Sequence, residues 1–162
     1  MFPKPCRVGL AALLVGVFFL TSAALAAAPE QANQEKQVRA LVKSAVKLVK
    51  AKGEAAFAEF NVKNGPWHKG DTCIFVSDRK GVERANAASP ELVGKNLWNH
   101  KDPDGRLVVQ EQWKLVDTKG RGWIESKWAK PGTDKPLRCR SYVQGVKVKG
   151  QRYMVGAAYW LE

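Results

Sequence analysis

The sequence predicts an α+β fold in which a long N-terminal helix packs on an antiparallel sheet of about five strands. Apolar residues recur with helical spacing in the first half of the chain, whereas from residue 71 onward they follow strand patterns separated by turns containing Gly or Pro. The chain has 162 residues, of which 45% are hydrophobic and 26% are charged. These values indicate one globular domain and exclude a collagen-like or disordered chain.

Residues 1–26 predict an export signal. Lys4 and Arg7 precede an uninterrupted apolar stretch from Val8 to Leu20, and Ala24-Leu25-Ala26 fits the small-x-small cleavage pattern. The alternative is a membrane anchor, because the Ala-rich tail extends the stretch to nearly spanning length. We expect cleavage after Ala26, or one or two residues later, and therefore a periplasmic or secreted mature protein.

The mature chain is expected to begin with a flexible lead-in, residues 27–36, followed by a single domain over residues 37–162. Residues 37–53 predict an amphipathic helix, and residues 54–60 predict a short second helix. The apolar stripe of the first helix consists of Val38, Leu41, Val42, Ala45, Val46, Leu48 and Val49.

Five strands are predicted after residue 71. Their ranges are 72–77, 82–87, 122–130, 137–147 and 153–160. A helical turn is expected at residues 89–92, after which a helix over residues 107–116 carries an apolar stripe through Leu107, Val108, Glu111 and Leu115.

The chain is strongly basic, with 27 Lys and Arg residues against 15 acidic ones and a formal net charge of +12. One function compatible with this charge is a basic interaction protein that binds anionic polymers, with its fold serving as a scaffold. The basic residues are spread along the whole chain instead of forming one arginine-rich stretch. We therefore expect a solvated basic surface and no nucleic-acid partner.

No catalytic or metal-binding motif is present in the sequence. His68 and His100 have no metal-ligand spacing, and the chain lacks CxxC, GxSxG, Walker and GxGxxG motifs. Cys73 could serve as a nucleophile with a histidine base, but its place within an apolar strand favours a structural role. We expect no enzymatic activity, no cofactor and no metal site.

Two cysteines, Cys73 and Cys139, remain after removal of the predicted signal. An even number of cysteines in an oxidising compartment is typical of a disulfide. The alternative is two buried thiols, and the residues alone leave both open.

Aromatic and small polar residues alternate along the predicted C-terminal strands. Ser126 and Trp128 share one face of their strand, and Cys139 and Ser141 share one face of the next. Aromatic walls with a few placed polar groups are typical of small-ligand pockets. Most of the six tryptophans should nevertheless serve the core.

Six segments in series resemble the single Cache domain, the PAS-like extracytoplasmic sensor domain of bacterial chemoreceptors and sensor kinases. They are GDTCIFVSDRKG, SPELVGKNL, KDPDGR, GRGWIESKWAKPG, RCRSYVQGV and YMVGAAYW. The resemblance implies a sheet of strand order 2-1-5-4-3, with the long helix on one face and a pocket on the other. It also implies a small ligand, often an organic acid or amino acid, and no catalytic step.

The same resemblance implies a sensory function in signal transduction. The chain looks like a free-standing exported form, so its expected partners are a small-molecule ligand and a membrane receptor or kinase. A homodimer through the N-terminal helix is a further expectation from the family.

The resemblance also suggests which side chains line the pocket. The candidate ligand-binding residues are Asn86, Trp98, Trp113, Ser126, Trp128, Cys139 and Ser141. Asn86, Ser126 and Cys139 stand where the family often has His, Tyr and Lys, which commonly hold an anionic ligand. Arg138 and Arg140 are candidates to supply the lost charge, although Arg140 should face away from Ser126. The pocket is therefore either re-specified for another ligand or vestigial.

The implied strand order bears on the two cysteines, because it places the last strand between those that carry Cys73 and Cys139. Two strand spacings amount to roughly 9.6 Å, whereas a disulfide needs Cα atoms within about 7 Å. A bridge would require the last strand to end short of them or the sheet to pinch, and the question stays open.

Overall fold

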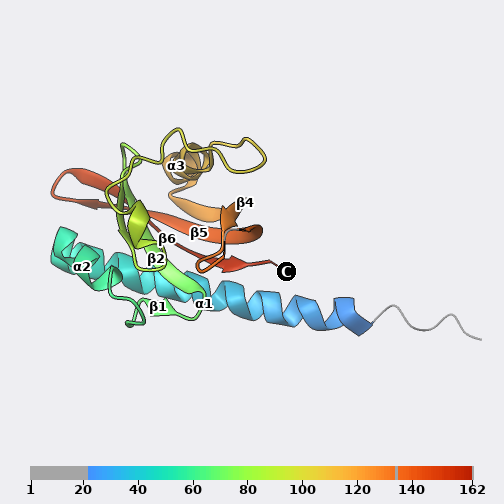
Figure 1. Ribbon diagram of the computed structural model, residues 1–162. Coiled ribbons are helices and arrows are strands. Elements are labelled where there is room, and N and C mark those ends of the chain that lie inside the picture. The colour runs from blue at the N-terminus through green and yellow to red at the C-terminus, as the bar shows by residue number, and fades with distance from the viewer. Residues whose placement is uncertain (1–21, 134, 162) are drawn as a thin grey trace, which may run out of the picture.

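A six-stranded antiparallel sheet lies between a long helix on one face and a shorter helix on the other (Figure 1). The computed structural model describes residues 22–133 and 135–161. The predicted signal peptide, residues 1–26, therefore lies largely outside the described residues. Within the described part of the chain, no helix is both long and apolar enough to cross a membrane.

The elements follow the predicted order. The helices are α1 (Ser22–Lys52), η1 (Gly53–Ala55), α2 (Ala56–Phe60), η2 (Pro90–Leu92) and α3 (Val108–Lys119). The strands are β1 (His68–Lys69), β2 (Thr72–Asp78), β3 (Glu83–Asn86), β4 (Arg121–Ala129), β5 (Pro136–Val148) and β6 (Gln151–Trp160).

The strand order confirms the implied topology. Strand β3 pairs with β2, and the sheet continues through β6 and β5 to β4. The predicted order 2-1-5-4-3 is this same order when the five predicted strands are numbered along the chain. Strand β1, whose two residues pair with Thr72 and Cys73 of β2, is not among the predicted strands. Two residues are too short to show a strand period, which explains why the pattern gave no signal.

Helix α1 covers one face of the sheet along β5 and β6 (Figure 1). Its predicted stripe is buried at Val38, Val42 and Val49, which pack with the inward side chains Tyr153 and Val155 of β6. A fully buried valine stabilises the fold by about 1.5–3 kcal/mol relative to an exposed one. The stripe therefore fixes which face of the sheet is closed by α1.

Residues 27–36, expected from the sequence to be a flexible lead-in, are helical, because α1 continues through this segment. Its polar composition suggested a linker, but Ala, Glu, Gln and Lys are all strong helix formers. The helix begins at Ser22 and has 31 residues.

Helix α3 packs on β4 and β5 from the opposite side. Its buried face differs from the predicted stripe, since Glu111 and Leu115 are only half-buried. Glu111 instead pairs with the guanidinium of Arg106, and this ion pair holds it at the surface. The fully covered residues of α3 are Val108, Val109, Gln112, Trp113 and Val116.

Two glycines allow close contacts on the α3 side of the sheet. Gly81 has φ +82° in the predicted turn after β2, where a Cβ would lie within about 3 Å of the Trp98 backbone. Gly156 of β6 lies under the ring of Phe75, and a Cβ there would come within 2.3 Å of the ring Cζ. The Phe75 ring can therefore lie over β6 only because position 156 carries no side chain.

This contact makes Gly156→Ala destabilising. We expect a loss of about 1–3 kcal/mol, typical of adding a methyl group to a filled core, measured by urea denaturation. The same substitution should cost much less in a Phe75→Leu background, because Leu lacks the ring atoms that the new Cβ meets. An equal cost in both backgrounds would show that the ring contact is not the cause.

Candidate ligand-binding site

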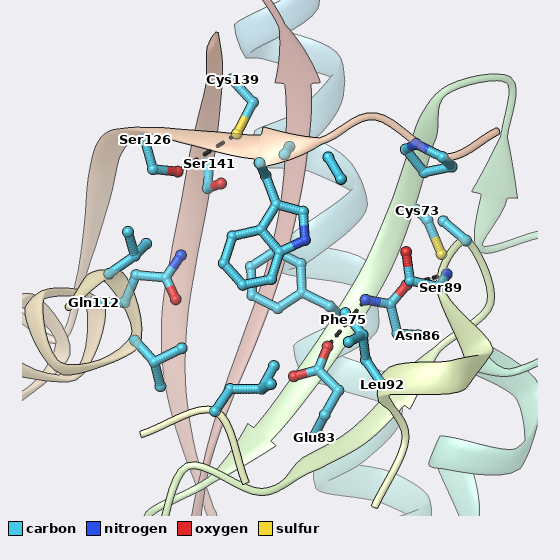
Figure 2. Close-up of a pocket in the computed structure, with 18 of the residues that line it drawn as sticks. Cys73, Phe75, Glu83, Asn86, Ser89, Leu92, Gln112, Ser126, Cys139 and Ser141 are labelled. Atoms are coloured by element: carbon cyan, nitrogen blue, oxygen red, sulfur yellow. Dashed lines mark hydrogen bonds between the residues drawn. The ribbon is translucent and has the colours of Figure 1, made fainter. Parts of the chain in front are cut away.

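A cavity of about 100 Å³ lies on the face of the sheet that α1 leaves free (Figure 2). We call it the sheet cavity. It is lined by Asp71, Cys73, Phe75, Glu83, Asn86, Ala88, Ser89, Leu92, Leu97, Val108, Val109, Gln112, Ser126, Trp128, Ala129, Pro131, Cys139, Ser141, Ala158 and Trp160. The walls thus come from the sheet, from α3 and from the connection between β3 and α3.

Small side chains on adjacent strands leave this space open. Ser126 of β4 lies opposite Cys139 of β5, and Ser141 of β5 lies opposite Ala158 of β6. Because successive strand residues alternate between faces, these four side chains share the face opposite α1. A sheet with large residues at these positions would fill the cavity.

Five of the seven predicted site residues line the sheet cavity. They are Asn86, Ser126, Trp128, Cys139 and Ser141. Figure 2 shows Ser126, Cys139 and Ser141 together on one side, while Asn86 and Ser89 lie on the other. The Ser126 hydroxyl and the Cys139 thiol are 3.5 Å apart and form a hydrogen bond in which either group can donate.

The prediction that Trp98 and Trp113 line the cavity is wrong. Trp113 is fully buried in the core under α3, and its Nε1 donates to the Ser77 hydroxyl at 3.2 Å. Trp98 is half-buried beside the guanidinium of Arg79, whose Cζ lies 5.3 Å from the indole centroid. Both rings serve packing, because tryptophan composition does not distinguish a pocket wall from a core residue.

Glu83 is the functional candidate that sequence reasoning missed. It is 5% exposed, and its carboxylate points into the sheet cavity (Figure 2). Strand alternation gave no signal for it, because the pairing of β2 with β3 shifts register between Val76 and Ser77. Ala85, opposite Val76, packs in the core on the α1 side, whereas Glu83, opposite Ser77, lines the cavity on the other face.

Among the described residues, the side chain that donates a hydrogen bond to the Glu83 carboxylate is that of Asn86. Its Nδ2 donates to Glu83 Oε1 at 3.0 Å, while its Oδ1 accepts a hydrogen bond from the Ser89 backbone N–H at 3.0 Å. The Asn86 backbone N–H in turn donates to Asn61 Oδ1 at 2.9 Å. These contacts fix the amide in the orientation that presents its N–H to Glu83.

Burial raises the pKa of Glu83 to about 8, and the hydrogen bond from Asn86 lowers it only in part. A carboxylate removed from water prefers its neutral form unless a cation accompanies it. At neutral pH, Glu83 is therefore mostly protonated and able to donate a hydrogen bond within the cavity.

The described lining of the sheet cavity contains two acids, Asp71 and Glu83, and no Lys, Arg or His. The suggestion that Arg138 or Arg140 supplies a positive charge is wrong. Arg138 pairs with Glu125 at 3.0 Å, and Arg140 pairs with Glu35 of α1. Both arginines lie on the face of β5 away from Ser141, as strand alternation requires.

Cys73 and Cys139 are free buried thiols, which is the second of the two alternatives that the sequence left open. Strand β6 lies between β2 and β5, pairing with β2 from Ile74 onward, and Trp160 of β6 lies directly opposite Cys139. The last strand thus does not end short of the cysteines, and the separation of two strand spacings remains. Burial raises the pKa of both thiols.

An ion pair lies at the edge of the sheet cavity. Lys130 Nζ, between the lining residues Ala129 and Pro131 of the β4–β5 hairpin, is 2.6 Å from Asp71 Oδ2. This contact joins the hairpin to the β1–β2 turn. Among residues 22–133 and 135–161, no cluster of three His, Cys, Asp or Glu side chains is arranged to hold a metal ion.

The thiol state leads to a direct prediction. In the native protein, iodoacetamide at pH 7.5 should alkylate Cys73 and Cys139 only slowly, because both are buried and protonated. In guanidinium chloride without reductant, both should be alkylated fully, as read by peptide mass spectrometry. Peptides linked through these two cysteines, resistant to alkylation in denaturant, would contradict the free-thiol structure.

Glu83 should make stability depend on pH. Its pKa is about 8 when folded against an ordinary value of 4.5, so between these values the folded state holds more protons than the unfolded state. The free energy of unfolding therefore falls as pH rises from 4.5 to 8. Glu83→Gln removes this dependence and should be more stable than the wild type at pH 8, by on the order of 2–4 kcal/mol. At pH 5 the difference in stability between the two proteins should be smaller.

The measurement is thermal or urea denaturation at pH 5 and pH 8. Glu91→Gln, in the exposed part of η2, is the matched control and should follow the wild type at both pH values. Parallel pH profiles for the wild type and Glu83→Gln would contradict the assignment of a raised pKa to Glu83.

Comparisons with known proteins agree with this architecture. A family profile described as Cache domain matches residues 61–161. The methyl-accepting chemotaxis protein McpP of Pseudomonas putida is 31% identical over 92 residues, which cover 57% of this chain. The match spans only 16% of the length of that curated relative.

Solved structures give the same fold. A periplasmic sensor domain of a chemotaxis protein matches with a TM-score of 0.69 and 26% identity, covering 82% of this chain and 98% of that one. A Cache chemosensory domain studied for carboxylic acid recognition matches with a TM-score of 0.67 and 24% identity, over 88% and 100% of the two chains.

A methyl-accepting chemotaxis protein from Vibrio parahaemolyticus matches with a TM-score of 0.69 and 19% identity, over 86% of this chain and 98% of that one. At identities below 25%, the last two structures show the fold alone. The profile match covers more than half of the sequence, and it confirms the resemblance on which the predicted strand order was based. The chain belongs to the Cache domain family.

Proposed function

We propose that this chain is an exported, small-molecule-binding sensory module of the single Cache type that performs no catalysis. The observation that carries the proposal is the sheet cavity, which lies on the face opposite α1 and brings Asn86, Ser126 and Ser141 around one space. Membership of a family of sensor domains supports the same function. The proposed place of action is the periplasm or the exterior, after cleavage of residues 1–26.

The volume of the sheet cavity sets the size of the ligand. An apolar cavity of 150 Å³ in another protein accommodates benzene, which has six non-hydrogen atoms. A space of about 100 Å³ therefore suits a ligand of roughly three to five non-hydrogen atoms. Short organic acids and the smallest amino acids, the classes that the family resemblance implies, fall within this range, and short amines have a similar size.

The lining of the sheet cavity combines apolar side chains with polar ones. Leu92, Val108 and Val109 provide apolar contacts for an alkyl chain, whereas Ser126, Ser141 and Gln112 provide hydroxyl and amide groups. This combination is typical of pockets that orient a small ligand by a few polar contacts within an apolar wall. We therefore interpret the pocket as re-specified for a ligand other than the usual carboxylate, and not as vestigial.

The sensory output would pass through α1 to a membrane receptor or kinase. Strands β5 and β6 line the cavity with one face and pack against α1 with the other. A shift of these strands on ligand binding would therefore move α1 as well, because the two are packed together. Pairing of two chains through this helix is part of the same proposal.

Ligand binding should raise the thermal stability of the purified protein. At a ligand concentration one hundred times Kd, the expected gain is about 2.7 kcal/mol, or several degrees in Tm. We suggest a panel of propionate, glycine, alanine, ethylammonium and 1-propanol. At least one of these compounds should shift Tm.

Ala158→Leu places a large side chain in the sheet cavity and should abolish the shift. Ala58→Leu, at an exposed position of α2, makes the same change away from the cavity and should leave the shift intact. The proposal fails if no compound of the panel stabilises the protein, or if Ala158→Leu retains the full shift in a folded variant.

A further inference from the structure

Glu83 is a buried acid without a counter-charge. It is 5% exposed, and Oε1 accepts a hydrogen bond from the neutral amide of Asn86 at 3.0 Å. Among the described residues, no hydrogen bond reaches the other oxygen, Oε2, and the carboxylate points toward the interior of the sheet cavity (Figure 2). An ionised carboxylate in such a place is costly unless a cation pairs with it.

The protein itself does not provide that cation. The neighbouring Arg84 points away from the cavity, toward Asp78 and Glu54 at 3.9 and 4.0 Å. Lys130, at the cavity edge, is paired with Asp71 at 2.6 Å. The described lining contains no other basic side chain, so the one group that could complete a charge pair with Glu83 is a ligand.

The remaining walls suit a cation with a short alkyl chain. Phe75 and Trp128 line the cavity, and aromatic rings attract organic cations through their negative faces. Leu92, Leu97 and Val109 cover the apolar remainder. A carboxylate ligand, by contrast, would enter a space that already contains acids and has no positive partner.

We propose that the sheet cavity binds a small primary ammonium ion of two to four carbon atoms, with the carboxylate of Glu83 as the group that receives it. This inference rests on the proposed ligand-binding function and names its ligand class. The ammonium group replaces the proton of Glu83: neutral Glu83 and the ammonium ion give an ion pair in the cavity, and one proton is released to solvent.

Proton release makes the affinity depend on pH. Burial raises the pKa of Glu83 to about 8, so below this value binding must first remove the proton. The other titratable groups of the lining are Asp71, Cys73 and Cys139. Burial raises the pKa of both thiols, so they stay neutral in this range, and Asp71 is paired with Lys130. Glu83 is therefore the group that governs the pH profile.

The test is calorimetric titration of the full protein with ethylammonium chloride at pH 6, 7, 8 and 9, at constant ionic strength. Ethylammonium stays charged in this range, since primary amines titrate near 10.4. The association constant should rise about tenfold per pH unit below pH 8 and level off above it. At pH 7, repeat titrations in buffers of different ionisation enthalpy should show release of close to one proton.

Glu83→Gln should weaken ethylammonium binding at pH 8 by at least about thirtyfold, the usual effect of removing one partner of a buried charge pair. It should also remove the pH dependence. Glu91→Gln, which neutralises an exposed acid on η2, should leave both unchanged. Thermal denaturation of each variant establishes that the fold is retained.

The outcomes separate the two proposals. If propionate or 1-propanol binds and ethylammonium does not, the ammonium inference is wrong while the sensory function stands. If ethylammonium binds equally to the wild type and to Glu83→Gln, Glu83 is not the receiving group and the inference is wrong. If no compound binds at all, the proposed function itself fails.

Discussion

The packing of α1 on one face of the sheet is the constraint on which the rest of the structure depends. Its buried valines close that face along β5 and β6 and form one core with Tyr142 and Val146 of β5 and Val155 of β6. Strand alternation then directs the neighbouring residues, such as Ser141 and Ala158, to the other face. There α3 covers only part of the sheet, and the cavity lies between the sheet, α3 and the connection between β3 and α3.

The cavity depends on which side chains are absent as much as on those present. Gly156 lets the Phe75 ring lie over β6, and Ser126, Cys139 and Ala158 are too small to fill the space beside it. Into this largely apolar space β3 places one acid, Glu83, oriented by Asn86. Keeping an acid there without a counter-charge costs stability, and such a cost is characteristic of positions selected for function.

Much of this arrangement could be predicted from the sequence, because it depends on local periodicity. The stripe of α1 and the five main strands were identified by their spacing, and alternation placed Ser126, Cys139 and Ser141 on one face. Burial depth and the distances between strands are not local properties. For that reason Glu83 was missed, Trp98 and Trp113 were assigned to the wrong surroundings, and the pairing of Cys73 with Cys139 could not be decided until β6 was seen between them.

The length of α1 has a mechanical consequence. With 31 residues it is about 46 Å long at 1.5 Å per residue, and its N-terminal part runs well past the edge of the sheet (Figure 1). The sheet holds the C-terminal part of α1, so a small rotation of the helix at the sheet becomes a larger displacement at its N-terminal tip. Val38 is buried against the sheet, so the 11 residues from Ala27 to Gln37 form an N-terminal arm of about 16 Å in the proposed mature chain. A tilt of about 5° at the sheet would displace the tip of this arm by about 1.4 Å. A sub-ångström adjustment around a molecule of a few atoms can thus become a displacement that a neighbouring protein can sense.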